Sequence, residues 1–203
     1  MLYESTRGGL KSILSAQAIK MGIAPDGGLF VPSTPVKLSS EEIYSLANMS
    51  YQERAVFILK HFLDDYSIDE LKQCVNSAYT KEKFGTDDVA PVVKLNENVH
   101  VLELWHGPTC AFKDMALQIL PHFMVKAVEK TGETGETVIL VATSGDTGKA
   151  ALEGFKDVDG TRVIVFFPDG GVSDVQKMQM ITQDGKNTYS IGVQGNFDDA
   201  QNG

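Results

Sequence analysis

In the second half of the chain, short continuous apolar runs alternate with segments whose apolar residues have the spacing of a helix. Residues 137–143, 162–167 and 188–193 are rich in apolar and β-branched side chains, which predicts strands. The stretches between them, 147–155 and 173–182, have the apolar spacing of helices. Near-continuous apolar strands are typical of parallel strands covered on both faces, and helical crossovers join such strands. The pattern therefore predicts the α/β class, with a doubly wound parallel sheet and helices on both faces.

Two further elements precede this alternation. Residues 92–95 and 99–104 flank the polar turn formers 96–98, and this arrangement predicts a β-hairpin. A helical stretch follows, from about residue 113 to residue 130. Pro121 lies inside it, and because proline has no backbone N–H to donate, we expect it to kink this helix or split it in two.

The first part of the chain shows a series of helix starts. Ser39, Ser50 and Ser67 are each followed three residues later by a glutamate. In this capping box the serine hydroxyl and the carboxylate satisfy backbone N–H groups that a helix leaves without partners. We therefore predict a mainly helical N-terminal region at 1–90, after an extended first segment, and an α/β domain at 91–203.

The last residues have the pattern of a helix start. Asn196 is a typical N-cap, and Asp198 and Asp199 give the first turn its favoured negative charge. The sequence reaches Gly203 about one turn later. We therefore expect the α/β domain to be truncated at its C-terminal end, by design or by proteolysis.

Composition narrows the class of protein. Lys and Arg number 18 against 27 Asp and Glu, and the formal charge of −9 argues against general binding to nucleic acids or anionic membranes. The longest apolar runs, 138–142 and 163–167, are far shorter than the ~20 residues of a membrane span. The first residues have no basic head followed by an apolar core, so no secretory signal is predicted.

The cysteines point to a reducing compartment. Cys74 and Cys110 are 36 positions apart, form no C-x-x-C motif and have no histidine pair at zinc spacing. This usage is typical of cytosolic proteins rather than of disulfide scaffolds. We expect a cytoplasmic protein without a metal site.

The loop at 105–114 is the first candidate for chemistry, because ligands of α/β sheets bind at loops that lead from strands into helices. It carries Lys113 in the first turn of a predicted helix, beside the apolar Phe112. The helix dipole and apolar surroundings both favour a neutral amine, which is the nucleophile that forms Schiff bases with carbonyl cofactors. A surface lysine paired with Asp114 is the alternative. His106 would either orient a substrate or pack within the loop.

The loop at 142–150 is the second candidate. Gly145 and Gly148 allow a ligand to approach the backbone closely. Ser144, Thr147 and the N–H groups of the following helix suit a carboxylate or a phosphate. The loop departs from the P-loop motif at two required positions and is no dinucleotide fingerprint. An ordinary N-capped helix is the alternative here.

These loops carry a family resemblance. Residues 106–114, His-Gly-Pro-Thr-Cys-Ala-Phe-Lys-Asp, resemble the cofactor-lysine motif of threonine synthases. Three further parts agree in order, namely 3–7 with 27–32, then 143–148, then 195–199. The resemblance implies a pyridoxal-phosphate enzyme of the tryptophan-synthase-β-like fold, also called fold type II.

The resemblance also assigns residues. Lys113 matches the lysine that forms the aldimine with pyridoxal 5'-phosphate, and Thr109 and Phe112 line its approach. The loop beside the pyridoxal ring, which binds polar groups of cofactor and substrate, matches Ser144, Gly145, Asp146 and Thr147.

The implied reaction converts O-phospho-L-homoserine and water to L-threonine and phosphate, which makes the protein a carbon–oxygen lyase of threonine biosynthesis. Family members are longer, and their glycine-rich loop for the cofactor phosphate and their polar partner of the pyridine nitrogen lie downstream. We therefore expect the 203 residues alone to bind the cofactor weakly and to turn over little.

Three other hypotheses remain open. The first is another fold-type-II pyridoxal-phosphate lyase, although Asp146, where such relatives commonly carry Asn, favours threonine synthase. The second is a catalytically silent threonine-synthase-like protein that binds a phosphate metabolite, and an intact Lys113 argues against it. The third is a generic phosphate-binding α/β module.

Overall fold

A computed structural model describes residues 1–202. The chain divides into two compact units. The first combines residues 1–79 with 122–134, and the second combines 80–121 with the chain from residue 135 on. Neither unit is a continuous stretch of chain, because the segment 122–134 returns to the first one.

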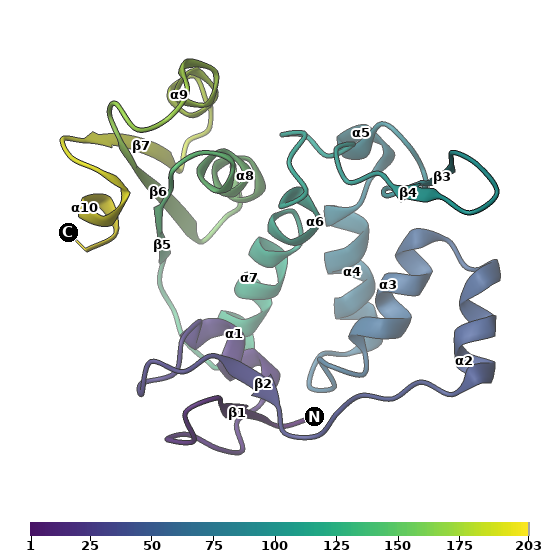
Figure 1. Cartoon of the computed structure of the whole chain (residues 1–203). Helices are drawn as coiled ribbons and strands as arrows, with labels where there is room; N and C mark the ends of the chain where they lie inside the picture. Colours follow the sequence, from purple (N-terminus) through teal and green to yellow (C-terminus); the bar gives the residue numbers. More distant parts are fainter. Residues whose placement is uncertain (203) are drawn as a thin grey trace. The chain divides into compact units, whose positions relative to one another are not determined.

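The first unit contains two short strands and several helices (Figure 1). Strand β1 (Tyr3–Ser5) pairs antiparallel with β2 (Phe30–Pro32). The helices are α1 (Ser15–Met21), α2 (Ser40–Ser45), a 3-10 turn η1 (Leu46–Asn48), α3 (Tyr51–Leu59), α4 (Ile68–Ala78) and most of α7 (Leu120–Lys130).

The three predicted capping boxes are confirmed. The hydroxyls of Ser39, Ser50 and Ser67 each accept a hydrogen bond from the backbone N–H three residues on. The glutamates at those positions accept from the serine N–H at 2.8, 2.7 and 2.7 Å in turn. Helices α2, α3 and α4 begin at the next residue in each case, because the caps satisfy N–H groups without helical partners.

Helix α4 supplies much of the core of the first unit, and α7 packs beside it. Leu71 and Val75 of α4 are completely buried. The Tyr66 hydroxyl donates a hydrogen bond to the Phe123 carbonyl at 3.1 Å, and the two rings meet edge to face. A salt bridge of 2.9 Å between Lys130 and Glu70 joins the end of α7 to the first turn of α4.

The second unit contains a hairpin and a parallel sheet. Strands β3 (Val92–Lys94) and β4 (His100–Leu102) pair antiparallel, which confirms the predicted hairpin. Strands β5 (Thr137–Ala142), β6 (Thr161–Pro168) and β7 (Thr188–Val193) form a sheet in the order β5-β6-β7, with both pairings parallel. The helices are α5 (Lys81–Phe84), α6 (Asp114–Leu117), α8 (Asp146–Phe155), α9 (Asp174–Ile181) and α10 (Phe197–Asn202).

The long helix expected after residue 113 is split in two. Helix α6 ends at Leu117 and α7 begins at Leu120, so the break precedes Pro121. Proline disfavours the helical conformation in the residue before it and is tolerated in the first turn of a helix. The proline therefore lies at the start of the second helix rather than at a kink within one.

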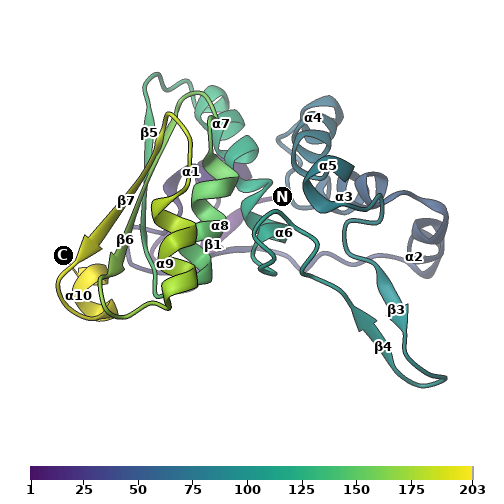
Figure 2. The same ribbon diagram turned by 90° about the horizontal axis from the view of Figure 1, so that it is seen from above.

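The sheet packs its core on one face. Val163, Val165 and Phe167 of β6 alternate toward α8, where they meet Leu152 and Phe155. Helices α8 and α9 lie on this face, and α10 lies on the other (Figures 1 and 2). The predicted parallel α/β sheet with helices on both faces is confirmed.

The face that carries α10 is only partly covered. Two side chains of β5 on this face, Val138 and Leu140, are 50% and 67% exposed. Tyr189 and Ile191 of β7 are also exposed. A row of large apolar side chains thus crosses the sheet in contact with solvent.

A methyl group at Gly154 is expected to destabilise the protein. A Cβ atom there would collide with the carbonyl oxygen of Leu117, because α6 lies directly against α8. Alanine gains about 1 kcal/mol over glycine inside a helix, whereas overpacking costs about 1–3 kcal/mol, and a backbone carbonyl cannot rotate away. We expect Gly154→Ala to lower the free energy of unfolding by about 1–2 kcal/mol in urea denaturation.

Gly170→Ala is the matched control, since no atom lies within 4 Å of a Cβ atom built there. Its effect is expected to stay within about 0.5 kcal/mol. A Gly154→Ala variant more stable than the parent would contradict the close packing of α6 on α8.

Candidate functional site

Lys113 lies where the candidate loop enters α6. It occupies the position just before the helix, with a helical backbone conformation (φ −64°, ψ −20°). Its Nζ atom is 4.3 Å from the centroid of the Phe112 ring, which is itself exposed. Within residues 1–202, the amine makes no hydrogen bond or ion pair, so the expected alternative of a Lys113–Asp114 pair is not found. The amine is free to react with a ligand.

Asp114 is the residue in this loop that the sequence did not single out as functional. Its side chain is completely buried. Oδ2 accepts a hydrogen bond from the backbone N–H of Thr109, and Oδ1 accepts one from the Thr109 hydroxyl, both at 2.8 Å. A Cβ atom on Gly107 would come within 2.5 Å of this carboxyl group, so only glycine fits there. The loop is thus folded around one carboxylate, which fixes the residue next to Lys113.

The electrostatic surroundings of Asp114 place α6 beside α8. Burial raises the pKa of the Asp114 carboxyl above its usual value, and the two hydrogen bonds from Thr109 act in the opposite direction. Glu153 raises this pKa further and Lys149 lowers it, and both belong to α8. Burial has the largest effect, so the folded protein disfavours ionisation at this position.

The two residues predicted to line the approach to Lys113, Thr109 and Phe112, have different surroundings. The Thr109 hydroxyl is directed to Asp114, whereas the Phe112 ring faces the Lys113 amine. Their expected place along the approach of a cofactor stays a prediction. Cys110, between them, adopts a left-handed conformation (φ 59°) that non-glycine residues rarely take, and its N–H donates to the Gly107 carbonyl at 3.0 Å.

His106 is held within the loop region. Its Nε2 atom lies 2.7 Å from a carboxylate oxygen of Glu103, and its ring stacks on Trp105 with centroids 5.8 Å apart. These contacts hold the ring in the loop, and the expected role in orienting a substrate stays a prediction.

The second candidate loop is organised by a threonine hydroxyl. Thr143, at the end of β5, accepts hydrogen bonds from the N–H groups of Gly145 and Gly148, each at 3.0 Å. The same hydroxyl donates to the Gly145 carbonyl at 3.1 Å. A Cβ atom on Gly148 would lie 2.5 Å from the Thr143 methyl and 2.8 Å from Val165, so this glycine permits α8 to approach the sheet. The sequence marked the glycines but not this buried hydroxyl.

The polar residues predicted to bind ligands lie around the start of α8. Ser144 and Asp146 are exposed and Thr147 is partly exposed. Asp146 accepts a hydrogen bond from the Gln176 amide at 2.9 Å. In the described chain, the hydroxyls of Ser144 and Thr147 have no hydrogen-bond partner. With the N–H groups of the first helical turn, these hydroxyls form a set of donors that suits an anionic group.

The structure thus gathers the predicted residues into two clusters, one at the start of α6 and one at the start of α8. Both belong to the second unit, and α6 packs against α8 where Leu117 meets Gly154. Across residues 1–202, no hydrogen bond joins Lys113 to the residues at 144–147. The clusters lie on two helices that contact each other at Leu117 and Gly154, and a ligand would have to bridge the clusters.

Two structural properties bear on other classes of function. In the described part of the chain, no three His, Cys, Asp or Glu side chains group in a way that could hold a metal ion. None of the helices in that part has the length and apolar character needed to cross a membrane.

Comparison with known proteins gives a consistent family. A family model described as "Threonine synthase N terminus" matches residues 2–79. A threonine synthase of Pseudomonas aeruginosa is 41% identical over 202 residues, which cover 99% of this chain and 42% of that protein. A human protein named "Threonine synthase-like 1" is 41% identical over 194 residues, which cover 92% of this chain and 26% of that protein.

A solved structure agrees in fold. The structure titled as PLP-bound threonine synthase from Brucella melitensis superposes with a TM-score of 0.91 at 39% identity. It covers 100% of this chain, which in turn covers 43% of that one. The chain therefore spans about two fifths of the length of the threonine synthases that it matches.

Replacing Thr109 is expected to destabilise the loop through Asp114. Thr109→Val removes the hydroxyl donor while leaving the side-chain shape, so a buried carboxylate loses one of its two hydrogen bonds. Hydrogen bonds to charged groups contribute about 1.5–3 kcal/mol, and we expect a loss of this size in the free energy of unfolding, measured by urea denaturation at pH 7. Thr109→Ser keeps the hydroxyl and should lose much less, whereas equal losses in both variants would contradict this role of the hydroxyl.

The two cysteines are expected to differ in reactivity. Cys110 is exposed, whereas Cys74 is 2% exposed and burial raises the pKa of its thiol to about 11. At pH 8 roughly one thousandth of such thiols is ionised, and the thiolate is the reactive form. Iodoacetamide should therefore alkylate Cys110 and spare Cys74, as read by peptide mass spectrometry. Both should react in urea, and equal labelling of the folded protein would refute the assignment.

Proposed function

The chain corresponds over its whole length, in sequence and in fold, to the N-terminal part of threonine synthases, and we propose on this premise that it carries their cofactor-lysine site. The reaction proposed for the complete site converts O-phospho-L-homoserine and water to L-threonine and phosphate. The observation that supports this most directly is the unpaired amine of Lys113 at the start of α6, within the motif 106–114.

The residues present suit pyridoxal 5'-phosphate. The cofactor offers an aldehyde to a primary amine, and Lys113 supplies an amine free of hydrogen bonds and ion pairs in the described chain. Substrate and cofactor both carry anionic groups, and Ser144 and Thr147 supply free hydroxyls beside the N-terminus of α8. When bound, the cofactor supplies an electron sink for carbanion chemistry.

Each residue then has a proposed role. Lys113 would hold the cofactor through its amine, and the same amine would carry protons at the substrate Cα and Cβ atoms. Ser144, Gly145 and Thr147 donate hydrogen bonds to polar groups of the ligands. Asp146, which accepts a hydrogen bond from the Gln176 amide, is proposed to accept one from a substrate N–H.

Asp114 is proposed to act indirectly. It closes the turn that begins at Gly107 and thereby fixes the backbone of Lys113, without itself touching a ligand. A reacting group must be held within a fraction of an ångström of its productive position. A buried carboxylate with two short hydrogen bonds provides such rigidity at the neighbouring residue.

The extent of the chain limits what these residues do alone. The relatives are more than twice as long, so the cradle of the cofactor phosphate and the partner of the pyridine nitrogen are proposed to come from their remaining parts. The 203 residues are accordingly expected to bind the cofactor weakly and turn over little. We place the activity in the cytoplasm, because both cysteines are free thiols.

A catalytically silent relative is the second candidate. The human protein named threonine synthase-like 1 is as similar to this chain, at 41% identity, as the threonine synthase of P. aeruginosa. Similarity alone therefore does not separate an enzyme from a binding protein. A reactive amine at Lys113 favours the enzyme, and the same measurement distinguishes a generic phosphate-binding module, which would form no covalent adduct.

Reductive trapping tests the proposed function. Pyridoxal phosphate followed by borohydride should label Lys113 ahead of the other lysines, as read by peptide mass spectrometry, because the donors at the start of α8 would hold the cofactor's anionic group. Lys149 is a suitable internal reference, since it is held by Glu153 and Gln183. Lys113→Arg should abolish the preferred label and leave the unfolding midpoint nearly unchanged. A preferred label on another lysine, or no label on Lys113 in a full-length version of the protein, would remove the enzyme hypothesis.

A further inference from the structure

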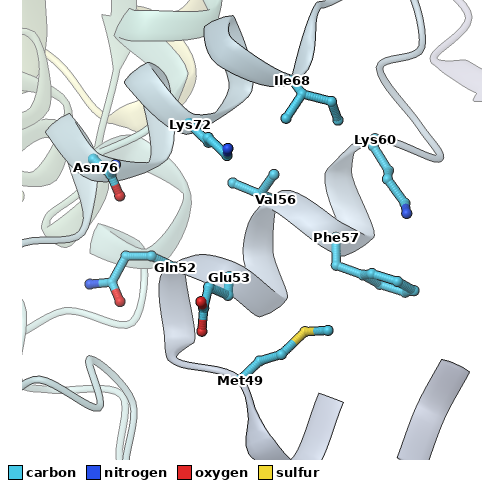
Figure 3. Close-up of a pocket in the computed structure, with 9 residues that line it drawn as sticks. All are labelled: Met49, Gln52, Glu53, Val56, Phe57, Lys60, Ile68, Lys72 and Asn76. Atoms are coloured by element: carbon cyan, nitrogen blue, oxygen red, sulfur yellow. The ribbon is translucent and has the colours of Figure 1, made fainter. Parts of the chain in front are cut away.

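A groove of about 390 Å³ lies between α3 and α4 in the first unit (Figure 3). None of its residues belongs to the loops described above. Pockets that hold small molecules have volumes of about 300–1,000 Å³, so this groove has room for a compact ligand. Its lining residues are Met49, Gln52, Glu53, Val56, Phe57, Lys60, Ile68, Lys72 and Asn76.

The floor and one end of the groove are apolar. Val56 and Phe57 of α3 and Met49 just before it line the groove together with Ile68 from the start of α4. Ile68, the first residue of α4 after its Ser67 cap, is 45% exposed. Covering such water-exposed apolar surface with an apolar ligand lowers the free energy, which favours binding.

Two hydrogen-bonding side chains of α4 lie at the other side. Lys72 and Asn76 are four residues apart, so they share one face of the helix. Both are exposed, and in the described chain neither makes a hydrogen bond or an ion pair. The Lys72 ammonium is directed toward Val56 (Figure 3), so a positive charge borders the apolar floor.

The remaining polar groups of the groove are already engaged. The Glu53 carboxylate accepts hydrogen bonds from the N–H and hydroxyl of Ser50 at 2.7 and 3.0 Å. It lies on the far side of Val56 from Lys72 in Figure 3. The Gln52 amide donates to the Tyr79 carbonyl at 2.7 Å, and the Lys60 ammonium lies 4.1 Å above the Phe57 ring.

We propose that this groove binds a small monocarboxylate with an aliphatic or aromatic body. The carboxylate accepts hydrogen bonds from the Lys72 ammonium and the Asn76 amide, and the apolar body covers Val56, Phe57 and Ile68. The charges are complementary, because the Lys72 ammonium is unpaired in the described chain and the one carboxylate of the lining, Glu53, is engaged by Ser50. The site is independent of the proposed cofactor lysine.

Titration of the 203-residue chain with 4-methylpentanoate, followed by NMR or calorimetry, tests the proposal. We expect saturable binding at one site, with 4-methylpentanamide of the same shape binding about tenfold more weakly because it lacks the charge. Lys72→Gln should weaken binding of the acid about tenfold and leave binding of the amide unchanged. Lys37→Gln, an exposed lysine outside the groove, should change neither.

Two further variants guard against a folding defect. Asn76→Asp places a negative charge beside the ligand carboxylate on an exposed helix position and should weaken binding of the acid only. Val56→Phe should fill the groove and weaken binding of acid and amide alike. The proposal is overturned by absence of saturable binding, by equal binding of acid and amide, or by unchanged affinity in Lys72→Gln at an unchanged unfolding midpoint.

Discussion

A single buried carboxylate determines the geometry of the loop that carries the candidate reactive amine. Among the described residues no cation forms an ion pair with Asp114, and the two hydrogen bonds from Thr109 are its direct stabilising contacts. Burying a charge without hydrogen bonds is far more costly than burying it with them, so the turn from Gly107 to Cys110 must stay closed. The left-handed backbone of Cys110 persists for the same reason, because the surrounding turn fixes it. The backbone of Lys113 is thus positioned by Asp114, while its amine makes no hydrogen bond or ion pair in the described chain.

The second loop follows the same principle with a neutral group. The Thr143 hydroxyl is buried and uses both its donor and its acceptor capacity on the backbone of the turn that starts α8. In both loops a buried polar side chain fixes the backbone, and within residues 1–202 the polar groups of Lys113, Ser144 and Thr147 next to it have no hydrogen-bond partner. Rigid backbone with free polar groups is the arrangement that recognition of a small ligand requires.

Much of this fold follows from local patterns. The capping boxes at Ser39, Ser50 and Ser67 set the starts of three helices, because a cap depends on residues four positions apart at most. The strands at β5 and β6 are recognisable in the sequence because both faces of each carry apolar side chains. The positions of the two ligand loops follow from the parallel order of the sheet.

The structural features that could not be predicted from the sequence depend on tertiary packing. Asp114 next to a lysine suggests a surface ion pair, and only the approach of α8 and of Gly107 shows that its carboxylate turns inward. Thr143 resembles any strand-terminal threonine until Gly148 and Val165 close over it. The exact break between α6 and α7 likewise reflects packing as well as Pro121.

The open face of the sheet sets the colloidal behaviour of the chain. Val138, Leu140, Tyr189 and Ile191 offer a flat apolar stripe on which two copies could stack, and the like charge of the molecules opposes their encounter. Added electrolyte shortens the reach of that repulsion to about 3 Å at 1 M while leaving the apolar attraction intact. We therefore expect its acidity to keep the chain dispersed and concentrated salt to remove that protection, so that turbidity rises with protein concentration.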